Sequence, residues 1–198
     1  MRRAHTAKPR LIAVDGVEAS AVLAAAKAAL AASTPGAPAA RGGISRWDAS
    51  GIFQDLAVAD DEAGVPSART LLLLYAADLA FRLRWQIRPA LAEGRTVVVA
   101  PYVDTAVAFG RAAGLQAAWL TNLFSFAPRA AERHFVHVRE AHATGAKGGF
   151  AAFACDRTGG GADSRNSRRL LEETAARLRR ADKGRTLRGE RSSPKPLL

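Results

Sequence analysis

The chain of 198 residues contains one cysteine, Cys155, and no apolar run long enough to cross a bilayer. A single cysteine excludes an intrachain disulfide, and a membrane-spanning helix needs about 20 consecutive apolar residues. The longest apolar run, residues 70–77, stops at Asp78. The basic N-terminus is followed by an apolar stretch that Asp15 and Glu18 interrupt, which argues against a signal peptide. We therefore expect a cytoplasmic protein with no membrane segment.

Metal-ligating and nucleophilic patterns are also scarce. His134 and His137 fall in one predicted strand, three positions apart, where side chains face opposite sides of a sheet. With His142 as the next candidate and a single cysteine elsewhere, we expect no metal site. No serine lies in a G-x-S-x-G turn and no cysteine–histidine pairing is indicated, so the sequence does not support hydrolase chemistry.

Acidic residues are outnumbered, with 18 Asp and Glu against 29 Lys and Arg, and the net charge is +11. The excess lies at the ends: residues 1–10 contribute +4, residues 157–198 contribute +7, and residues 11–156 are neutral. Basic ends attract a nucleic-acid backbone or an acidic surface, or they only keep the chain soluble. We expect a basic arm at residues 1–10, one domain after it, and a disordered basic tail at residues 183–198.

Strands alternate with helices along residues 11–182, which favours a mostly parallel sheet covered by helices on both faces. The predicted strands are residues 10–16, 96–100, 133–140 and 149–156. The predicted helices are residues 18–32, 48–56, 68–93 with a kink at Pro89, 103–114, 115–124 and 167–181. The predicted loops are residues 33–43, which are rich in Gly and Pro, and residues 58–64, which are rich in acidic residues.

The segment after the first predicted strand has the outline of a phosphate-binding loop without its charged residues. In the pattern G-x-x-x-x-G-K-[ST], backbone N–H groups wrap phosphates, the lysine contacts the β and γ phosphates, and the hydroxyl binds magnesium. With Gly16 as the first glycine, the second glycine position holds Ala21, the lysine position Val22 and the hydroxyl position Leu23. Taken alone, the segment indicates an ordinary strand–turn–helix.

Residues 70–110 resemble the thymidylate kinases in layout. That family has a helix reading like LLFxADRxxH, then IRPAL, a strand and DRYxxSxxAYQ; this chain has LLLYAADLAFR, IRPALAEG, TVVVA and PYVDTAVAFG. Upstream, LIAVDGVEAS is similar to the family's FIxFEGxDGS, and Ser45-Arg46 falls near its Thr-Arg-Glu-Pro segment. Three segments in this order over residues 11–110 imply the P-loop kinase fold, a three-layer α/β/α domain.

The chain departs from this family where the family carries out its chemistry. The Asp-Arg pair of DRY, which helps organise magnesium and contacts the substrate phosphate, is Ala100-Pro101 here. The arginine that faces the thymine base is Leu79. Because phosphoryl transfer depends on positioning and on cations, these losses and Val22 imply a catalytically degenerate relative with no catalytic residue and no cofactor.

The resemblance and the losses together imply a pseudoenzyme that acts as a partner-binding or regulatory subunit, and a homodimer formed through the helix at residues 68–93. Two alternatives stay open. One is an active dTMP kinase, dependent on ATP and magnesium, in which Arg41, Arg46 or a lid arginine supplies the missing cation. The other is an accessory nucleic-acid-binding protein that uses its basic termini.

Two groups of candidate site residues follow from the resemblance. The vestigial phosphate loop comprises Asp15, Gly16, Glu18, Ser20, Val22 and Leu23. The vestigial acceptor pocket comprises Arg46, Asp78, Arg82, Tyr102 and Asp104. Asp78 and Arg82 are spaced i,i+4 and so also indicate an ordinary helix ion pair, and Asp15-Gly16 is also a common turn pair.

Overall fold

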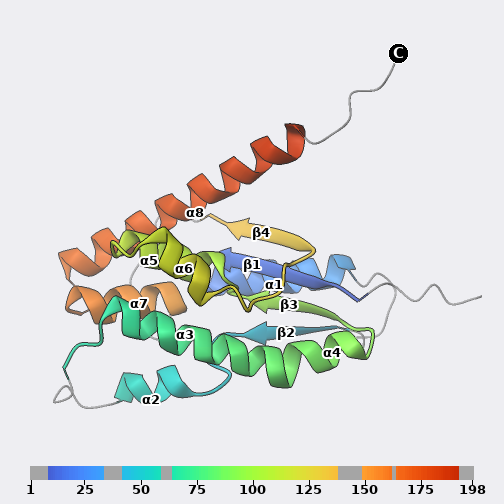
Figure 1. The fold of residues 1–198 in the computed structure, drawn as a ribbon, viewed down its shortest axis with the longest axis horizontal. Helices are drawn as coiled ribbons and strands as arrows, with labels where there is room; N and C mark the ends of the chain where they lie inside the picture. Colours follow the sequence, from blue (N-terminus) through green and yellow to red (C-terminus); the bar gives the residue numbers. More distant parts are fainter. Residues whose placement is uncertain (1–8, 34–41, 59–63, 138–148, 162–163, 192–198) are drawn as a thin grey trace, which may run out of the picture.

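The computed structural model describes residues 9–33, 42–58, 64–137, 149–161 and 164–191. Within them, four parallel strands form one sheet in the order β2-β3-β1-β4 (Figure 1). The strands are β1 (Leu11–Gly16), β2 (Gly42–Arg46), β3 (Thr96–Ala100) and β4 (Glu132–Val136). The predicted α/β class with a parallel sheet is confirmed.

Helices cover both faces of the sheet. They are α1 (Ala19–Ser33), α2 (Ile52–Val58), α3 (Ala68–Arg82), the π-helical η3 (Leu83–Ile87), α4 (Arg88–Ala92), α5 (Asp104–Ala112), α6 (Ala117–Leu123), α7 (Phe150–Gly159) and α8 (Arg165–Arg191). Successive side chains of β1 point to opposite faces of the sheet, so the strand contributes to two hydrophobic clusters. Ile12 and Val14 pack beneath α1, whereas Leu11 and Ala13 join the larger cluster on the other face. Helices α3, α5, α7 and α8 contribute to that larger cluster, so the three predicted layers are present.

The helix predicted over residues 68–93 contains one π turn. Ser67 caps its N-terminus by accepting from the backbone N–H of Thr70, and η3 joins α3 to α4 just before Pro89. In η3 the N–H of Arg88 donates to the carbonyl of Leu83, five residues back. Because proline lacks an N–H and crowds the preceding turn, the wider turn lets the helix continue to Ala92.

The predicted strand at residues 149–156 is wrong, because this segment forms helix α7. Phe150 and Cys155 are both buried to 1% exposure or less, and the residues between them are equally buried. A continuous apolar run is compatible with a buried strand or a buried helix. Gly149, at φ +90°, starts the helix and lies so close to α1 that an added Cβ would come within 3.1 Å of the Ala19 Cβ.

Two further predictions of local structure differ from what is observed. Strand β2 begins at Gly42, inside the predicted loop, and its pairing with β3 overrides a sequence containing two glycines. Helix α8 continues to Arg191, past its predicted end and into the predicted disordered tail, since Arg and Lys are good helix formers. Strand β4 covers Glu132–Val136, and residues 138–140 of the predicted strand lie outside the described residues. The predictions for residues 1–8 and 192–198 lie outside the described residues.

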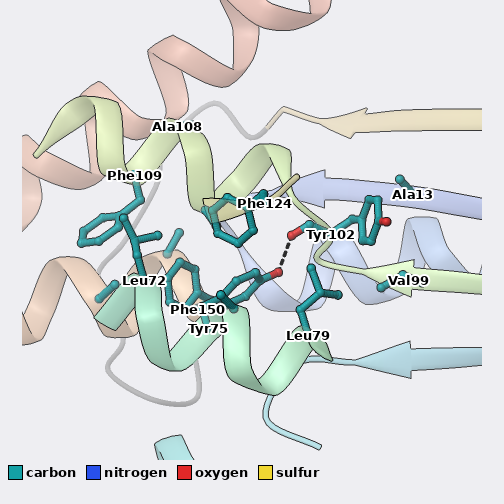
Figure 2. Packing of buried hydrophobic residues seen from close by; sticks show 14 of the residues in the cluster. Ala13, Leu72, Tyr75, Leu79, Val99, Tyr102, Ala108, Phe109, Phe124 and Phe150 are labelled. Carbon is teal, nitrogen blue, oxygen red and sulfur yellow. Dashed lines mark hydrogen bonds between the residues drawn. The ribbon is translucent and has the colours of Figure 1, made fainter. Parts of the chain in front are cut away.

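An aromatic cluster joins the elements at the carboxyl end of the sheet (Figure 2). Phe150 of α7 lies 4.2 Å from Tyr75 of α3 and 5.8 Å from Phe53 of α2, measured between ring centroids. Trp47, after β2, lies 5.1 Å from Phe53. Helix α7 is thereby packed across the end of the sheet that follows β1 and β3, where the candidate site residues lie.

Candidate functional site

The connection between β1 and α1 is too short to encircle a phosphate. Strand β1 ends at Gly16 and helix α1 begins at Ala19, so Val17 and Glu18 alone join them. A phosphate loop instead wraps its ligand with successive backbone N–H groups between the strand and the helix. The positions matching its second glycine, lysine and hydroxyl residue, residues 21–23, lie within the first turns of α1.

A carboxylate of the chain itself occupies the N-terminus of α1. Oε1 of Glu18 accepts hydrogen bonds from the backbone N–H of Ser20 at 2.9 Å and from its hydroxyl at 2.6 Å, and Oε2 accepts from the N–H of Ala21 at 2.8 Å. The bond from the Ser20 side chain is the main reason that the pKa of Glu18 lies below its usual value. Glu18 thus supplies the negative charge that a helix N-terminus otherwise takes from a bound phosphate.

Val22 is part of the core. Its side chain is 5% exposed and packs with Ile12 and Val98 beneath α1. It also lies against Gly16, where an added Cβ would come within 2.7 Å of the Val22 Cγ2. Leu23 and Val22 line a cavity of about 40 Å³. This is room for water, whereas ligand pockets measure about 300–1,000 Å³.

Asp15 is a buried capping residue. Its Oδ1 accepts from the backbone N–H groups of Tyr102 (3.1 Å) and Thr105 (2.9 Å) and from the Thr105 hydroxyl (2.8 Å), at the start of α5. Burial, and secondly the charge of Asp104, raise the pKa of Asp15 to about 6. The backbone N–H of Gly16 donates to the Thr105 hydroxyl at 3.1 Å, so β1 is joined twice to the turn after β3.

Asp78 and Arg82 form a fully buried ion pair. Nε of Arg82 lies 2.9 Å from Oδ2 of Asp78, and both side chains have zero exposure. Asp78 also accepts from the backbone N–H groups of Asp48 and Ser50 and from the Ser50 hydroxyl. Within the described residues Nε and Nη2 of Arg82 make no aligned hydrogen bond. The helix ion pair is therefore confirmed, but it lies in the interior and holds the turn after β2.

The turn after β3 is held from α3. Nη1 of Arg82 donates to the carbonyl of Pro101 at 3.2 Å. The hydroxyl of Tyr75 lies within hydrogen-bond distance of the carbonyls of Pro101 and Tyr102, and Figure 2 shows the bond to Tyr102. Tyr102 is 1% exposed, and its hydroxyl donates to the carbonyl of Pro128 at 2.6 Å. Burial raises the pKa of Tyr102 to about 12, so the phenol stays a donor at neutral pH.

Of the five candidate acceptor-pocket residues, Arg46 lines a cavity and the other four are engaged elsewhere. Arg46 is exposed and borders both the small cavity beside α1 and a wider hollow after β2. Asp104 lines neither of them, and its carboxylate pairs at 2.8 Å with Arg133 of β4 and with Arg185 of α8. The structure brings Asp15, Asp78 and Arg82 close to the turns after β2 and β3, where they hold backbone groups.

Three side chains hold this region together that were not predicted from the sequence as site residues. Thr105 holds Asp15, Tyr75 holds the turn after β3, and Asp48 caps α2 by accepting from the N–H groups of Phe53 and Gln54. Thr105 stands where the resembling family has the serine of DRYxxS, which was a usable signal. Tyr75 sits in an apolar run and gives none.

Among the described residues, no group of three or more His, Cys, Asp or Glu side chains is arranged to hold a metal ion. None of the described helices is long and apolar enough to span a bilayer.

Replacing Asp15 with Asn should change how stability depends on pH. A raised folded-state pKa means that the unfolded chain ionises first, so the contribution of Asp15 is full below about pH 4 and is lost as pH rises through about 6. We expect Asp15→Asn to gain about 2–3 kcal/mol relative to the wild type between pH 4 and pH 7 in urea unfolding. Asp55→Asn, an exposed carboxylate on α2, is the control; equal pH profiles for Asp15→Asn and wild type would contradict the assignment.

Replacing Asp78 with Ala should cost about 3–5 kcal/mol of unfolding free energy, because it leaves the Arg82 guanidinium buried without a counter-ion. The double variant Asp78→Ala/Arg82→Met should recover part of that loss in urea unfolding. The matched control is Glu173→Ala, which removes the partly exposed partner of Arg177 and Arg180 and should cost about 1 kcal/mol or less. Similar losses of unfolding free energy in Asp78→Ala and Glu173→Ala would contradict the role assigned to burial of the Asp78–Arg82 pair.

Comparison with known proteins finds similarity to thymidylate kinases over part of the chain. No protein-family model matches it. Over 57 residues, 29% of this chain and 28% of each relative, it is 44% identical to a probable thymidylate kinase of Pyrococcus horikoshii and 42% identical to one of Pyrococcus abyssi. A thymidylate kinase of Ehrlichia chaffeensis has the same fold, with a TM-score of 0.66 over 90% of this chain and 83% of that one, at 11% identity. The segment shared with the first two proteins and the fold shared with the third confirm the resemblance: this chain is similar to thymidylate kinases in one segment and in its fold.

Proposed function

We propose that this protein is a non-catalytic thymidylate-kinase-like protein that works in the cytoplasm as a partner-binding or regulatory subunit. The observation that carries this proposal is the Glu18 carboxylate on the N-terminus of α1. A phosphate at that position would meet a bound negative charge in place of free N–H groups and a lysine. The buried Val22 side chain supports the same conclusion, since it fills the space beside Gly16.

The missing groups are those on which phosphoryl transfer depends. Removing one group that stabilises developing charge costs about 2.7–4 kcal/mol in the barrier, or 10²–10³ in rate. Here the lysine position holds Val22 and the Asp-Arg position holds Ala100-Pro101, so at least three such groups are absent. The effects of groups that act together do not add simply, but the loss of any two leaves little turnover.

The alternative of an active dTMP kinase, using ATP and magnesium, rests on a replacement cation. Arg46 is the described residue that suits this role, because it is exposed and borders the cavity beside α1. Arg133 is held by Asp104. Arg41 and Arg139 lie outside the described residues.

Titration calorimetry and a coupled ADP-release assay test the proposal. We expect no binding of ATP–magnesium or dTMP, and no ADP release with thymidine, uridine or guanosine monophosphate. The matched variant is Glu18→Gln, which keeps the shape of the side chain without its charge; it should stay inactive and lose about 1 kcal/mol of stability. Saturable ATP binding by the wild type, or ADP release that Arg46→Gln abolishes, would establish the active kinase instead.

An apolar stripe on the α3–η3 helix supports an interface. Leu73, Phe81 and Trp85 are 50%, 39% and 65% exposed, and successive members of the series 73, 77, 81 and 85 are four positions apart, the spacing of one helix face. Exposed apolar patches of this kind mark protein contacts. We propose that a second copy of the chain binds this stripe, in keeping with the resemblance stated above.

Sedimentation velocity tests this dimer. We expect the wild type to sediment as a dimer, and Leu73→Glu with Phe81→Glu to sediment as a folded monomer, because two buried charges would oppose association. Val65→Glu is the matched control, since Val65 is 69% exposed and precedes the helix. A monomeric wild type at micromolar concentration, or equal effects of the two variants, would rule out the stripe as the dimer interface.

A further inference from the structure

Helix α8 has one buried face and one strongly basic face. Ser167, Leu171, Thr174 and Leu178 recur three or four positions apart, are at most 2% exposed, and face the core built with α5 and α7. Leu178 is the last buried apolar residue of α8 among those described. Figure 1 shows α8 on the outside of the molecule, with its last turns standing clear of the body in that view.

The opposite face carries a row of exposed cations, here called the α8 row. Its members are Arg165, Arg168, Arg169, Arg179 and Lys183. At 3.6 residues per turn they fall within about 100° of the helix circumference and extend over about 27 Å. One exposed acid, Glu172, lies among them, so the face has a net charge of +4.

The cations of the α8 row are uncompensated because the other described acids of the helix are occupied. Glu173 pairs with Arg177 and Arg180, and Asp182 pairs with His137. Within the described part of the chain, no member of the row lies within ion-pair distance of an acid. Five like charges on one helix face repel one another, and an external polyanion would relieve that repulsion.

We infer that the α8 row binds the phosphate backbone of a nucleic acid. Four of its five members are arginines, whose planar guanidinium suits phosphate oxygens. A membrane surface fits less well, because a helix that lies in a bilayer interface needs a free apolar face, and the apolar face of α8 is buried against α5 and α7. This function is independent of the proposed loss of kinase activity, and it assigns part of the basic excess of residues 157–198 to one face of helix α8.

Backbone contacts predict a salt dependence without sequence preference. Five phosphate contacts on duplex DNA give a slope of log K against log salt of about −4.5. Binding should therefore weaken roughly 500-fold between 50 and 200 mM salt. The affinity should change little between duplexes of unrelated sequence, because phosphates carry no base information.

Fluorescence anisotropy with the full-length protein and a labelled 25-base-pair duplex of arbitrary sequence tests the inference. Changing all five residues of the α8 row to Gln should weaken binding by ~100-fold at low salt and bring the slope near zero. The matched control removes the same charge from exposed positions elsewhere, through Arg to Gln changes at Arg69, Arg84, Arg88, Arg111 and Arg129. It should keep the wild-type slope, and circular dichroism should show that both variants are folded.

Each contrary outcome has a defined meaning. Equal losses in the two variants would mean that net charge, and not the α8 row, causes binding. Displacement of the duplex by polyglutamate at the same charge concentration would mean that the row recognises carboxylates on an acidic protein. Binding to phosphatidylserine vesicles that the row variant abolishes, with no binding to the duplex, would mean that the partner is a membrane. Any of these results overturns the inference.

Discussion

Helix N-termini at the carboxyl edge of a parallel sheet attract negative charge, and in this protein carboxylates of the chain itself supply that charge. Three helices begin just after a strand, and a carboxylate of the chain accepts from the first N–H groups of each. Glu18 caps α1, Asp48 caps α2, and Asp15 caps α5 from the neighbouring strand. A cap of this kind is worth about 0.5–2 kcal/mol, although burial raises the pKa of Asp15 and Asp48 and so offsets part of that gain for their charged forms. The edge that gives this fold its affinity for anions is therefore already satisfied.

The buried pair of Asp78 and Arg82 extends this internal closure. Asp78 holds the turn after β2 and Arg82 holds the turn after β3, so one turn of α3 fixes both. A buried ion pair is seldom a net source of stability, because desolvation offsets most of its attraction. Its effect here is geometric, since it joins the turns after β2 and β3 to one turn of α3. The hydroxyl proton of Tyr75 is shared between two carbonyls of the same turn, so the turn does not depend on Arg82 alone.

The sequence predicted the fold better than the site. Strands β1 and β3 are short apolar runs between turn signals, and helices α1, α3 and α5 follow from composition and spacing. The run of residues 150–155 was misassigned because full burial removes the periodicity that separates helix from strand. Strand β2 was missed because its formation depends on pairing with β3, a long-range contact that two glycines in its sequence do not suggest.

The site was harder because side-chain partners are set by tertiary contacts. The i,i+4 spacing of Asp78 and Arg82 indicated their pairing, but spacing does not reveal that both have zero exposure. Asp104 was expected near the acceptor pocket, and its direction was decided by Arg133 and Arg185, which lie 29 and 81 residues further along the chain. Val22 holds the lysine position and was expected to face a phosphate. Because helix α1 already begins at Ala19, Val22 lies in its first turn and is buried in the core.

Internal capping at the carboxyl edge of the sheet bears on where the two proposed contacts can form. Internal caps and the Asp78–Arg82 pair use the carboxyl edge of the sheet, but they leave the outer surfaces of α3 and α8 unchanged. Those two surfaces differ in chemistry, since the α3 stripe is apolar and the α8 row is cationic with its own apolar side buried. An apolar stripe gains from excluding water against a matching surface, whereas a cation row gains from neutralising a polyanion and releasing its counterions. The two proposed contacts draw on different free energies and different elements, so neither excludes the other.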